Sequence, residues 1–266
     1  MTRPPRRIVC LTEETTETLY LLGEADRIVG VSAYTMRPAE ARLKPRVSSF
    51  IDANFDRILE LRPDLVLGFS DLQADIAAEL IRRGVAVLTF NQRTVGEILD
   101  TIQMIGGLVG RGTEAAALVD RLTRGLEDIR TAAADFPRRP RVFFEEWDDP
   151  LISCIRWVHD LVEIAGGQPI FPELASGRLA KERFVDPAEV VRRDPEVIFA
   201  SWCGKRLRKD VVRRRPGWET VAAVRHDRIY EIPSVTILQP GPASLTDGVA
   251  RIHAHLRQAA APVADA

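Results

Sequence analysis

Two short segments of the chain combine side chains that could bind a ligand or perform chemistry. Glu145-Glu146-Trp147-Asp148-Asp149 follows one apolar run, and Trp202-Cys203-Gly204-Lys205 follows another. Carboxylates can hold cations or hydroxyl groups or act as general acids and bases, and a thiol beside a lysine can act as a nucleophile or a ligand. The alternative explanations are a solvated loop for the carboxylates and a small buried thiol for Cys203, and they stay open beside the functional ones.

The sequence lacks the motifs of the common nucleotide-binding and hydrolase sites. It has no P-loop and no G-x-S-x-G elbow, and Gly106-Gly107 follows a helical pattern rather than a strand, which argues against a dinucleotide turn. The four histidines are His159, His226, His253 and His255. No quartet of ligands has workable spacing, so we expect no bare metal site.

Composition and charge restrict the class of protein and its partners. Of the 266 residues 45% are hydrophobic and 28% are charged, which is typical of a globular protein. The 37 basic and 38 acidic residues leave a net charge of −1, so we expect no nucleic-acid partner. No apolar run is long enough to span a bilayer, so we expect no membrane insertion. The expected oligomeric state is a monomer. The apolar stretch Ile8–Leu11 is too short for a signal peptide. We therefore expect a cytoplasmic protein as the sequence is written, and a periplasmic or otherwise extracytoplasmic one if a leader was removed.

Short β-branched runs alternate with helical patterns in both halves of the chain. The order of these patterns predicts parallel sheets covered by helices. The predicted strands are Ile8–Leu11, Ile28–Val31, Leu65–Leu67, Ala86–Thr89, Val142–Phe144, Val197–Ala200 and Ile229–Ile232. The predicted helices are Thr15–Leu22, Phe55–Leu61, Asp71–Arg83, Val95–Leu108, Thr113–Ala134, Trp157–Ala165, Pro187–Arg193 and Leu245–Gln258.

The two halves resemble each other. Residues 58–67 can be laid on residues 190–199 at an offset of 132, and both segments combine a helix, a proline, an acidic residue and a strand. The prediction is therefore an α/β fold with two Rossmann-like lobes, each with a parallel sheet, joined by one long α-helix. The lobes span 1–110 and 138–266, and the helix spans 111–137. Such architectures bind ligands in a crevice at the carboxyl ends of their strands.

Several motifs resemble the substrate-binding proteins of ABC importers that have a rigid linker helix. The resemblance covers nearly the whole chain and is strongest to the vitamin B12 (cobalamin)-binding branch of periplasmic binding protein class III, in the helical backbone metal receptor superfamily. The motifs that carry it are Val31-Ser32-Ala33-Tyr34, Phe55–Val66, Ile164-Ala165-Gly166-Gly167, and Pro216–Val224 leading to Asp227-Arg228-Ile229-Tyr230.

The resemblance implies positions for ligand contacts and for docking. Tyr34 matches a ligand-contacting tyrosine, and Phe69 falls where the B12 binders carry a tryptophan against the corrin. Glu146, Trp147, Trp202 and Cys203 are the candidate ligand contacts of the second lobe. Asp75 and Glu189 match the two carboxylates that dock onto permease arginines, although Asp75 replaces the usual glutamate.

Taken together, the sequence predicts a non-enzymatic protein that binds one bulky small molecule, with no catalytic cofactor. Cobalamin or another corrinoid is the expected ligand, and an ABC permease is the expected partner unless the protein is a cytosolic relative of the importers. A ferric siderophore or haem is the alternative ligand. The alternative of another class is a cytosolic enzyme that uses the Glu145–Asp149 cluster and Cys203.

Overall fold

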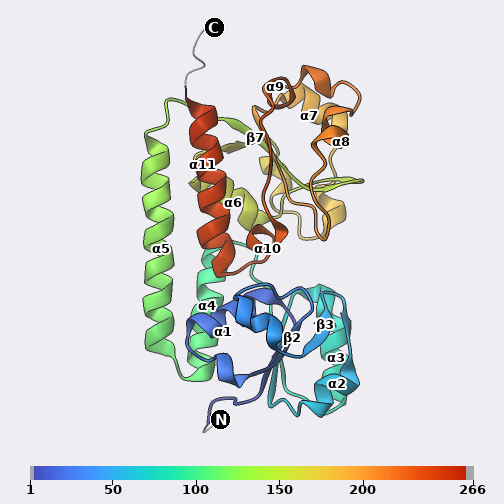
Figure 1. Ribbon diagram of the computed structural model, residues 1–266, viewed down its shortest axis with the longest axis vertical. Helices are drawn as coiled ribbons and strands as arrows, with labels where there is room; N and C mark the ends of the chain where they lie inside the picture. The colour runs from blue at the N-terminus through green and yellow to red at the C-terminus, as the bar shows by residue number, and fades with distance from the viewer. Residues whose placement is uncertain (1–2, 262–266) are drawn as a thin grey trace. The chain divides into compact units, whose positions relative to one another are not determined.

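The computed structural model describes residues 3–261, which form two compact units (Figure 1). Unit 1 comprises residues 3–122 together with Gln239–Ala243, and unit 2 comprises Thr123–Leu238 together with residues 244–261. The lobe boundaries expected from the sequence, 1–110 and 138–266, stay a prediction. Within residues 3–261, no helix combines the length and the apolar character that crossing a membrane requires.

Unit 1 is built on a six-stranded sheet with the strand order β4-β3-β2-β1-β5-β6. Neighbouring strands are parallel, except that β3 and β4 form an antiparallel hairpin. The strands are β1 Ile8–Cys10, β2 Ile28–Ser32, β3 Arg46–Ser49, β4 Asp52–Ala53, β5 Leu65–Phe69 and β6 Val87–Phe90. The helices are α1 Glu13–Leu21, α2 Phe55–Glu60, α3 Ala74–Arg82 and α4 Val95–Val109, with short helical turns η1 Ala25–Arg27, η2 Ala39–Leu43 and η3 Asp71–Gln73.

Unit 2 is built on a five-stranded sheet in which β11, β10, β7 and β8 follow one another and β9 also pairs with β7. Only the β7–β8 pair is antiparallel. The strands are β7 Arg141–Asp148, β8 Leu151–Ser153, β9 Gln168–Pro169, β10 Val197–Ala200 and β11 Ile229–Glu231. The helices are α6 Arg156–Ile164, α7 Pro187–Arg193, α8 Lys209–Arg213, α9 Ala222–Arg225, α10 Ser234–Ile237 and α11 Val249–Ala260, with the helical turns η4 Pro172–Leu174, η5 Ala180–Arg183, η6 Trp218–Thr220 and η7 Ser244–Gly248.

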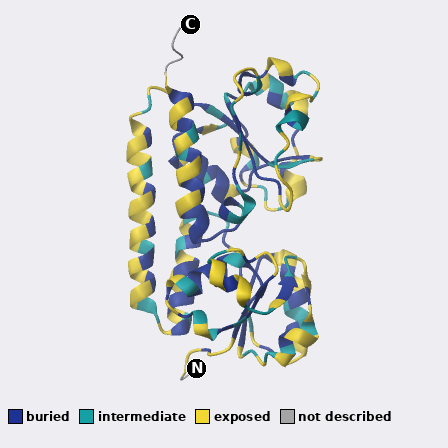
Figure 2. Ribbon diagram, viewed as in Figure 1, coloured by how far each residue is buried: buried dark blue, intermediate teal, exposed yellow. Residues whose placement is uncertain are grey.

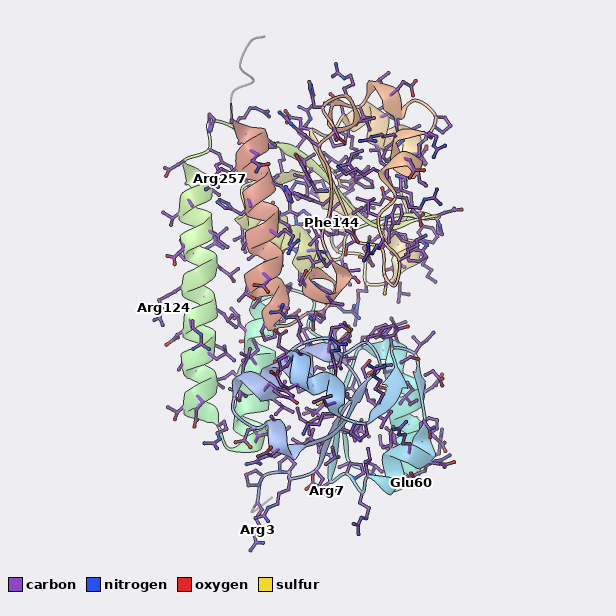
Figure 3. The ribbon with its side chains drawn as sticks, in the orientation of Figure 1. Arg3, Arg7, Glu60, Arg124, Phe144 and Arg257 are labelled. Atoms are coloured by element: carbon purple, nitrogen blue, oxygen red, sulfur yellow. The ribbon has the colours of Figure 1, made fainter. Side chains whose placement is uncertain are left out.

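The long helix predicted at Thr113–Ala134 is α5, Gly112–Ala134. Its buried residues lie three, four or seven positions apart, which is the pattern of a helix with one packed face; they are Ala115, Leu118, Leu122, Leu126 and Ala133. The rest of the helix is largely exposed in Figure 2, and the labelled Arg124 points outward in Figure 3. Residues of α5 belong to both compact units, so the division of the chain falls within this helix.

The expected internal repeat is visible in backbone geometry. Arg62 and Asp194, which are 132 positions apart, both have positive φ, at 47° and 43°. In unit 1 the Arg7 guanidinium donates to the carbonyls of Leu61 and Arg62, which end α2. In unit 2 Arg141 donates in the same way to the carbonyl of Asp194, which ends α7. Each unit therefore fixes its first strand against the end of a helix by the same contact.

The α/β class with mainly parallel sheets is confirmed, and each predicted strand and helix has a counterpart within a few residues. The end predicted for the strand Val142–Phe144 is wrong, because β7 continues to Asp148 and then turns into β8. The strand continues because Glu145 pairs with Ala200 of β10 and with Ser153 of β8, and Arg215, far away in sequence, neutralises its carboxylate. Strands β3, β4, β8 and β9 were not predicted, and three of them have only two or three residues.

Candidate functional site

The carboxyl ends of the parallel strands of unit 1 define one edge of its sheet, called here the unit 1 edge. The strand order reverses at β1, because β2 lies on one side of it and β5 on the other. Ligands of open α/β sheets bind at such a reversal, outside the carboxyl ends of the strands. The loops that follow β1, β2, β3, β5 and β6 therefore supply the candidate ligand contacts of this unit.

Three large apolar side chains of the unit 1 edge are exposed to solvent. Tyr34 follows β2 and is 48% exposed, Ile51 follows β3 and is 71% exposed, and Leu72 follows β5 and is 51% exposed. The buried Gln73 holds two of these loops together. Its amide donates to the carbonyl of Phe50 at 2.8 Å, and its carbonyl oxygen accepts from the Phe69 N–H at 2.9 Å.

Tyr34 was a sequence-predicted contact, whereas Ile51 and Leu72 were missed. Ile51 lies in the turn of the β3–β4 hairpin, which the sequence analysis did not predict. Leu72 lies in a segment predicted as regular helix, where an apolar residue is expected to be buried. The signal that could have identified both is a large apolar residue directly after a strand of a parallel sheet.

Phe69, the other predicted contact of this unit, ends β5 and is only 4% exposed. The guanidinium carbon of Arg93 lies 5.2 Å from the centre of its ring. Arg93 also pairs with Asp71 at 3.3 Å. Phe69 thus lies at the predicted edge, but its ring is buried and covered by the Arg93 guanidinium, so it does not present an exposed aromatic face to a ligand.

The first turn of α1 brings buried acidic groups to the end of β1. Glu14 accepts a hydrogen bond from the Thr12 hydroxyl at 2.5 Å, and burial raises the pKa of Glu14 to about 8. Glu17 accepts from Arg37 at 3.0 Å and from the Ala243 N–H at 3.1 Å. The segment Gln239–Ala243 is thereby held against this turn, and Gln92 donates to its Pro240 carbonyl at 3.1 Å.

Glu145 of unit 2 is completely buried in an ion pair. Arg215 donates two hydrogen bonds to its carboxylate at 2.7 and 2.8 Å, and the indole N–H of Trp202 donates a third at 2.9 Å. Burial raises the pKa of Glu145, and the bonds from Arg215 and Trp202 oppose that shift. The hypothesis that this carboxylate holds a cation or hydroxyl group of a ligand is therefore wrong, because its charge is compensated inside the protein.

Trp147 and Trp202 do lie in one group, as the sequence analysis expected. The ammonium of Lys205 is 4.1 Å from the ring centre of Trp147 and 5.0 Å from that of Trp202, and it also pairs with Asp148. Trp202 is 4% exposed. Cys203 is exposed in the same loop, whereas Cys10 and Cys154 are buried. The group combines one cation with two indole rings, of which that of Trp202 is buried.

Glu146 faces a different partner from Glu145, as alternation along a strand requires. The Arg183 guanidinium, itself 2% exposed, donates to both Glu146 oxygens at 2.6 and 3.0 Å and to the Ser153 carbonyl. The Ile155 N–H also donates to this carboxylate at 3.0 Å. The contacts that hold Glu146 are thus structural ones, and they fix β7, β8 and the start of α6 together.

The two predicted docking carboxylates lie on helices of different units. Asp75 is exposed in the first turn of α3. Beside it, a groove of about 380 Å³ runs between α3 and the edge strand β6, and Ala74, Ala77, Ile81 and Phe90 are among its lining residues. Glu189 lies in the first turn of α7 and pairs with Arg192 and Arg193. Asp75 is the more accessible of the two.

Comparisons with known proteins agree with the fold. Residues 8–236 match the family described as Periplasmic binding protein. The chain is 27% identical over 256 residues to the uncharacterized ABC transporter substrate-binding lipoprotein YvrC of Bacillus subtilis, across 93% of this chain and 78% of that protein. It is 25% identical over 262 residues to the vitamin B12-binding protein of Vibrio cholerae, across 96% of this chain and 90% of that protein.

Among solved structures, the periplasmic heme-binding protein RhuT from Roseiflexus sp. RS-1, in apo form, is similar with a TM-score of 0.83. That match has 21% identity and covers 96% of this chain and 99% of the other, so it shows the fold alone. The resemblance to substrate-binding proteins of ABC importers, expected from the sequence motifs, is confirmed by the family match and by the relatives. The chain belongs to the periplasmic binding protein family.

Proposed function

We propose that this protein is the substrate-binding component of an ABC importer and that its ligand is cobalamin or another corrinoid. The observation that carries the proposal is the exposed apolar surface of the unit 1 edge, formed by Tyr34, Ile51 and Leu72. The relative named a vitamin B12-binding protein, which aligns with 96% of the chain, supports the choice of ligand. We further propose that the Trp147–Trp202–Lys205 group is the ligand-contacting surface of unit 2 and that the protein acts as a monomer.

The physical basis of the proposal is the burial of apolar area. A corrin ring has broad apolar faces, and an apolar side chain that a ligand removes from water contributes about 1–2 kcal/mol. Ile51 and Leu72 are more than half exposed, so each has most of its surface still available for such a contact. Lys205 can in addition donate hydrogen bonds to the amide oxygens at the corrin periphery.

The test is titration of the purified protein with hydroxocobalamin, followed by calorimetry and by the visible absorbance that co-elutes in gel filtration. Ile51→Ser and Leu72→Ser should each weaken binding about 5- to 30-fold, which corresponds to about 1–2 kcal/mol. Leu43→Ser is the matched control, because Leu43 is 88% exposed but lies in η2, before β3. The thermal stability of the protein with and without hydroxocobalamin should be measured as well. If no visible absorbance co-elutes and the ligand does not raise the melting temperature, the corrinoid is not the ligand.

Haem or a ferric siderophore is the second candidate ligand, and the likeness to a heme-binding protein of the same fold is the reason to test it. Haemin and a ferric hydroxamate siderophore should be titrated under the same conditions as hydroxocobalamin. Tighter binding of either iron compound than of hydroxocobalamin would replace the corrinoid proposal. The Ile51 and Leu72 variants would then show whether the same edge binds that ligand.

We propose docking to the permease through Asp75 and Glu189. Asp75→Asn should reduce ligand-stimulated ATP hydrolysis by the reconstituted importer without changing ligand affinity. Glu189 must exchange its bonds to Arg192 and Arg193 for permease arginines, so Glu189→Gln should have the smaller effect. A change in ligand affinity of either variant would contradict a docking role.

We also propose that the protein has no catalytic role and works outside the cytoplasm. Arginines engage Glu145 and Glu146, and Lys205 pairs with Asp148, so three carboxylates of the supposed acid–base cluster are already bonded. The enzyme alternative requires turnover that disappears in Cys203→Ser and Glu146→Gln. The lipoprotein relative supports an extracytoplasmic location, which fractionation of the producing cells tests directly.

A further inference from the structure

His159 of α6 is a buried imidazole with unmet hydrogen-bonding capacity. The residue is 6% exposed, and among residues 3–261 neither ring nitrogen has a hydrogen-bond partner. A buried polar atom without a partner costs roughly 1–3 kcal/mol, so an unpaired imidazole needs an explanation. The backbone of the helix does not satisfy these nitrogens either, because the N–H groups of Val158 and His159 already donate to the Ile155 carbonyl.

Two carboxylates of the same helix face one of these nitrogens. Nδ1 of His159 lies 3.8 Å from Oδ1 of Asp160 and 3.7 Å from Oε2 of Glu163. One donor atom from each of the three residues lies within 4.8 Å of the other two. Asp160 is held by Arg156 at 2.7 Å, whereas the Glu163 side chain is 51% exposed and can move.

We infer that His159, Asp160 and Glu163 form a binding site for one divalent transition-metal ion. Ligand atoms of a tetrahedral zinc ion lie about 3.4 Å apart. The two separations from Nδ1 would need to shrink by about 0.3–0.4 Å, and the separation between the two carboxylate oxygens, which is within 4.8 Å, by up to about 1.4 Å. Rotation of the half-exposed Glu163 side chain would shorten the separations that involve Oε2, whereas the 3.8 Å between Nδ1 and Oδ1 must shorten through His159 or Asp160. Three protein ligands would leave one position open for water or another small ligand, as in zinc sites that are not purely structural.

The donor types favour a transition metal over calcium or magnesium. Imidazole nitrogen suits zinc, nickel and copper, whereas calcium and magnesium prefer oxygen alone. The Asp160 and Glu163 carboxylates supply the negative charge. Arg156 donates to Oδ1 of Asp160, the oxygen that faces Nδ1, so this oxygen would bind the metal while it accepts from the guanidinium. The proton of His159 must then lie on Nε2, which leaves the Nδ1 lone pair for the metal.

No metal site was predicted from the sequence, because it offers no four ligands with workable spacing along the chain. This set instead uses positions i, i+1 and i+4 of one helix, in which the first and last share a face. The competing explanation is a protonated His159 paired with both carboxylates, which needs no metal. The two explanations differ in one measurable property, stoichiometric binding of a transition metal.

The experiment is titration of the metal-depleted full chain with Co²⁺, a visible probe for zinc sites, and with Zn²⁺ by calorimetry. We expect one equivalent of Co²⁺ to bind with d–d absorption in the visible range. His159→Gln and Glu163→Gln should each weaken binding at least about tenfold. His226→Gln, which changes an exposed histidine outside the cluster, should leave binding unchanged.

Two results would overturn the inference. One is the absence of a stoichiometric Co²⁺ or Zn²⁺ site in the unaltered protein, which would favour the protonated ion pair. The other is metal binding that His159→Gln and Glu163→Gln leave unchanged, which would indicate adventitious ions elsewhere. Glu163 is half exposed, so Glu163→Gln is expected to fold normally and keeps the test valid if His159→Gln does not fold.

Discussion

Replacing Glu14 by glutamine should change how the stability of this protein depends on pH. Glu14 is 3% exposed at the start of α1, and it accepts a hydrogen bond from Thr12. Burial raises its pKa from the ordinary 4.5 to about 8, because the charged form loses its hydration. Glutamine keeps the size and the polar character of the side chain but cannot ionise.

The sign follows from which state holds the proton more tightly. The folded protein binds the Glu14 proton up to about pH 8, whereas the unfolded chain releases it near 4.5. Rising pH between these values therefore favours unfolding. With 1.36 kcal/mol per pKa unit, Glu14 lowers the free energy of unfolding by about 1 kcal/mol at pH 5 and by about 3 kcal/mol at pH 7.

The assay is urea denaturation of both proteins at several pH values between 5 and 8. The stability of Glu14→Gln relative to the unaltered protein should rise by about 2–3 kcal/mol between pH 5 and pH 7. Burial also raises the pKa values of Glu13 and Glu145, which both proteins share, so the difference reports Glu14 together with its interaction with the charge of Glu13. Glu60→Gln, which changes an exposed carboxylate of α2, is the control. A difference that stays constant with pH would refute the reasoning.

Three further predictions concern other parts of the molecule. Arg215→Met leaves Glu145 buried without its partner, so it should lower the free energy of unfolding in urea by roughly 3–5 kcal/mol. Adding Glu145→Gln to this variant should restore most of the lost stability. A loss under about 1 kcal/mol in Arg215→Met would contradict the buried ion pair. Gly23→Ala should lower the free energy of unfolding by about 1–2 kcal/mol, because the residue has a positive φ. Gly166→Ala should lower it further, because a Cβ there would also lie 2.7 Å from the Phe136 ring. Equal losses of stability in the two variants would be inconsistent with this packing. A thiol reagent should label one cysteine of the native protein, and Cys203→Ser should abolish that labelling; protection by ligand would place Cys203 at the site.

Much of the fold could be predicted because periodicity and breaker residues are local signals. Gly84 and Gly110 end α3 and α4 in left-handed conformations, and Thr94 with Glu97 forms a capping box at the start of α4. The repeat at an offset of 132 was detectable for the same reason. The short strands β8 and β9 were not, because their formation depends on pairing with β7 and not on their own composition.

The candidate site was harder to predict, because its charged side chains pair with residues that lie far away in the sequence. The sequence shows Glu145 and Glu146 as one acidic run, yet Arg215 engages the first and Arg183 the second. Nothing local to the run indicates either partner. Phe69 and Trp202 were correctly expected near strand ends, but their burial follows from Arg93 and from Glu145, which no spacing rule connects to them.

The return of Gln239–Ala243 to unit 1 has a consequence for any attempt to separate the two units. In sequence this segment follows residues 123–238 of unit 2, yet it hydrogen-bonds to Glu17 and Gln92 of unit 1. Protein synthesis must therefore proceed past position 243 before the first unit is complete. A ribosome stalled earlier would hold a nascent chain whose Glu14 is uncovered, because Gly241 packs directly on that side chain.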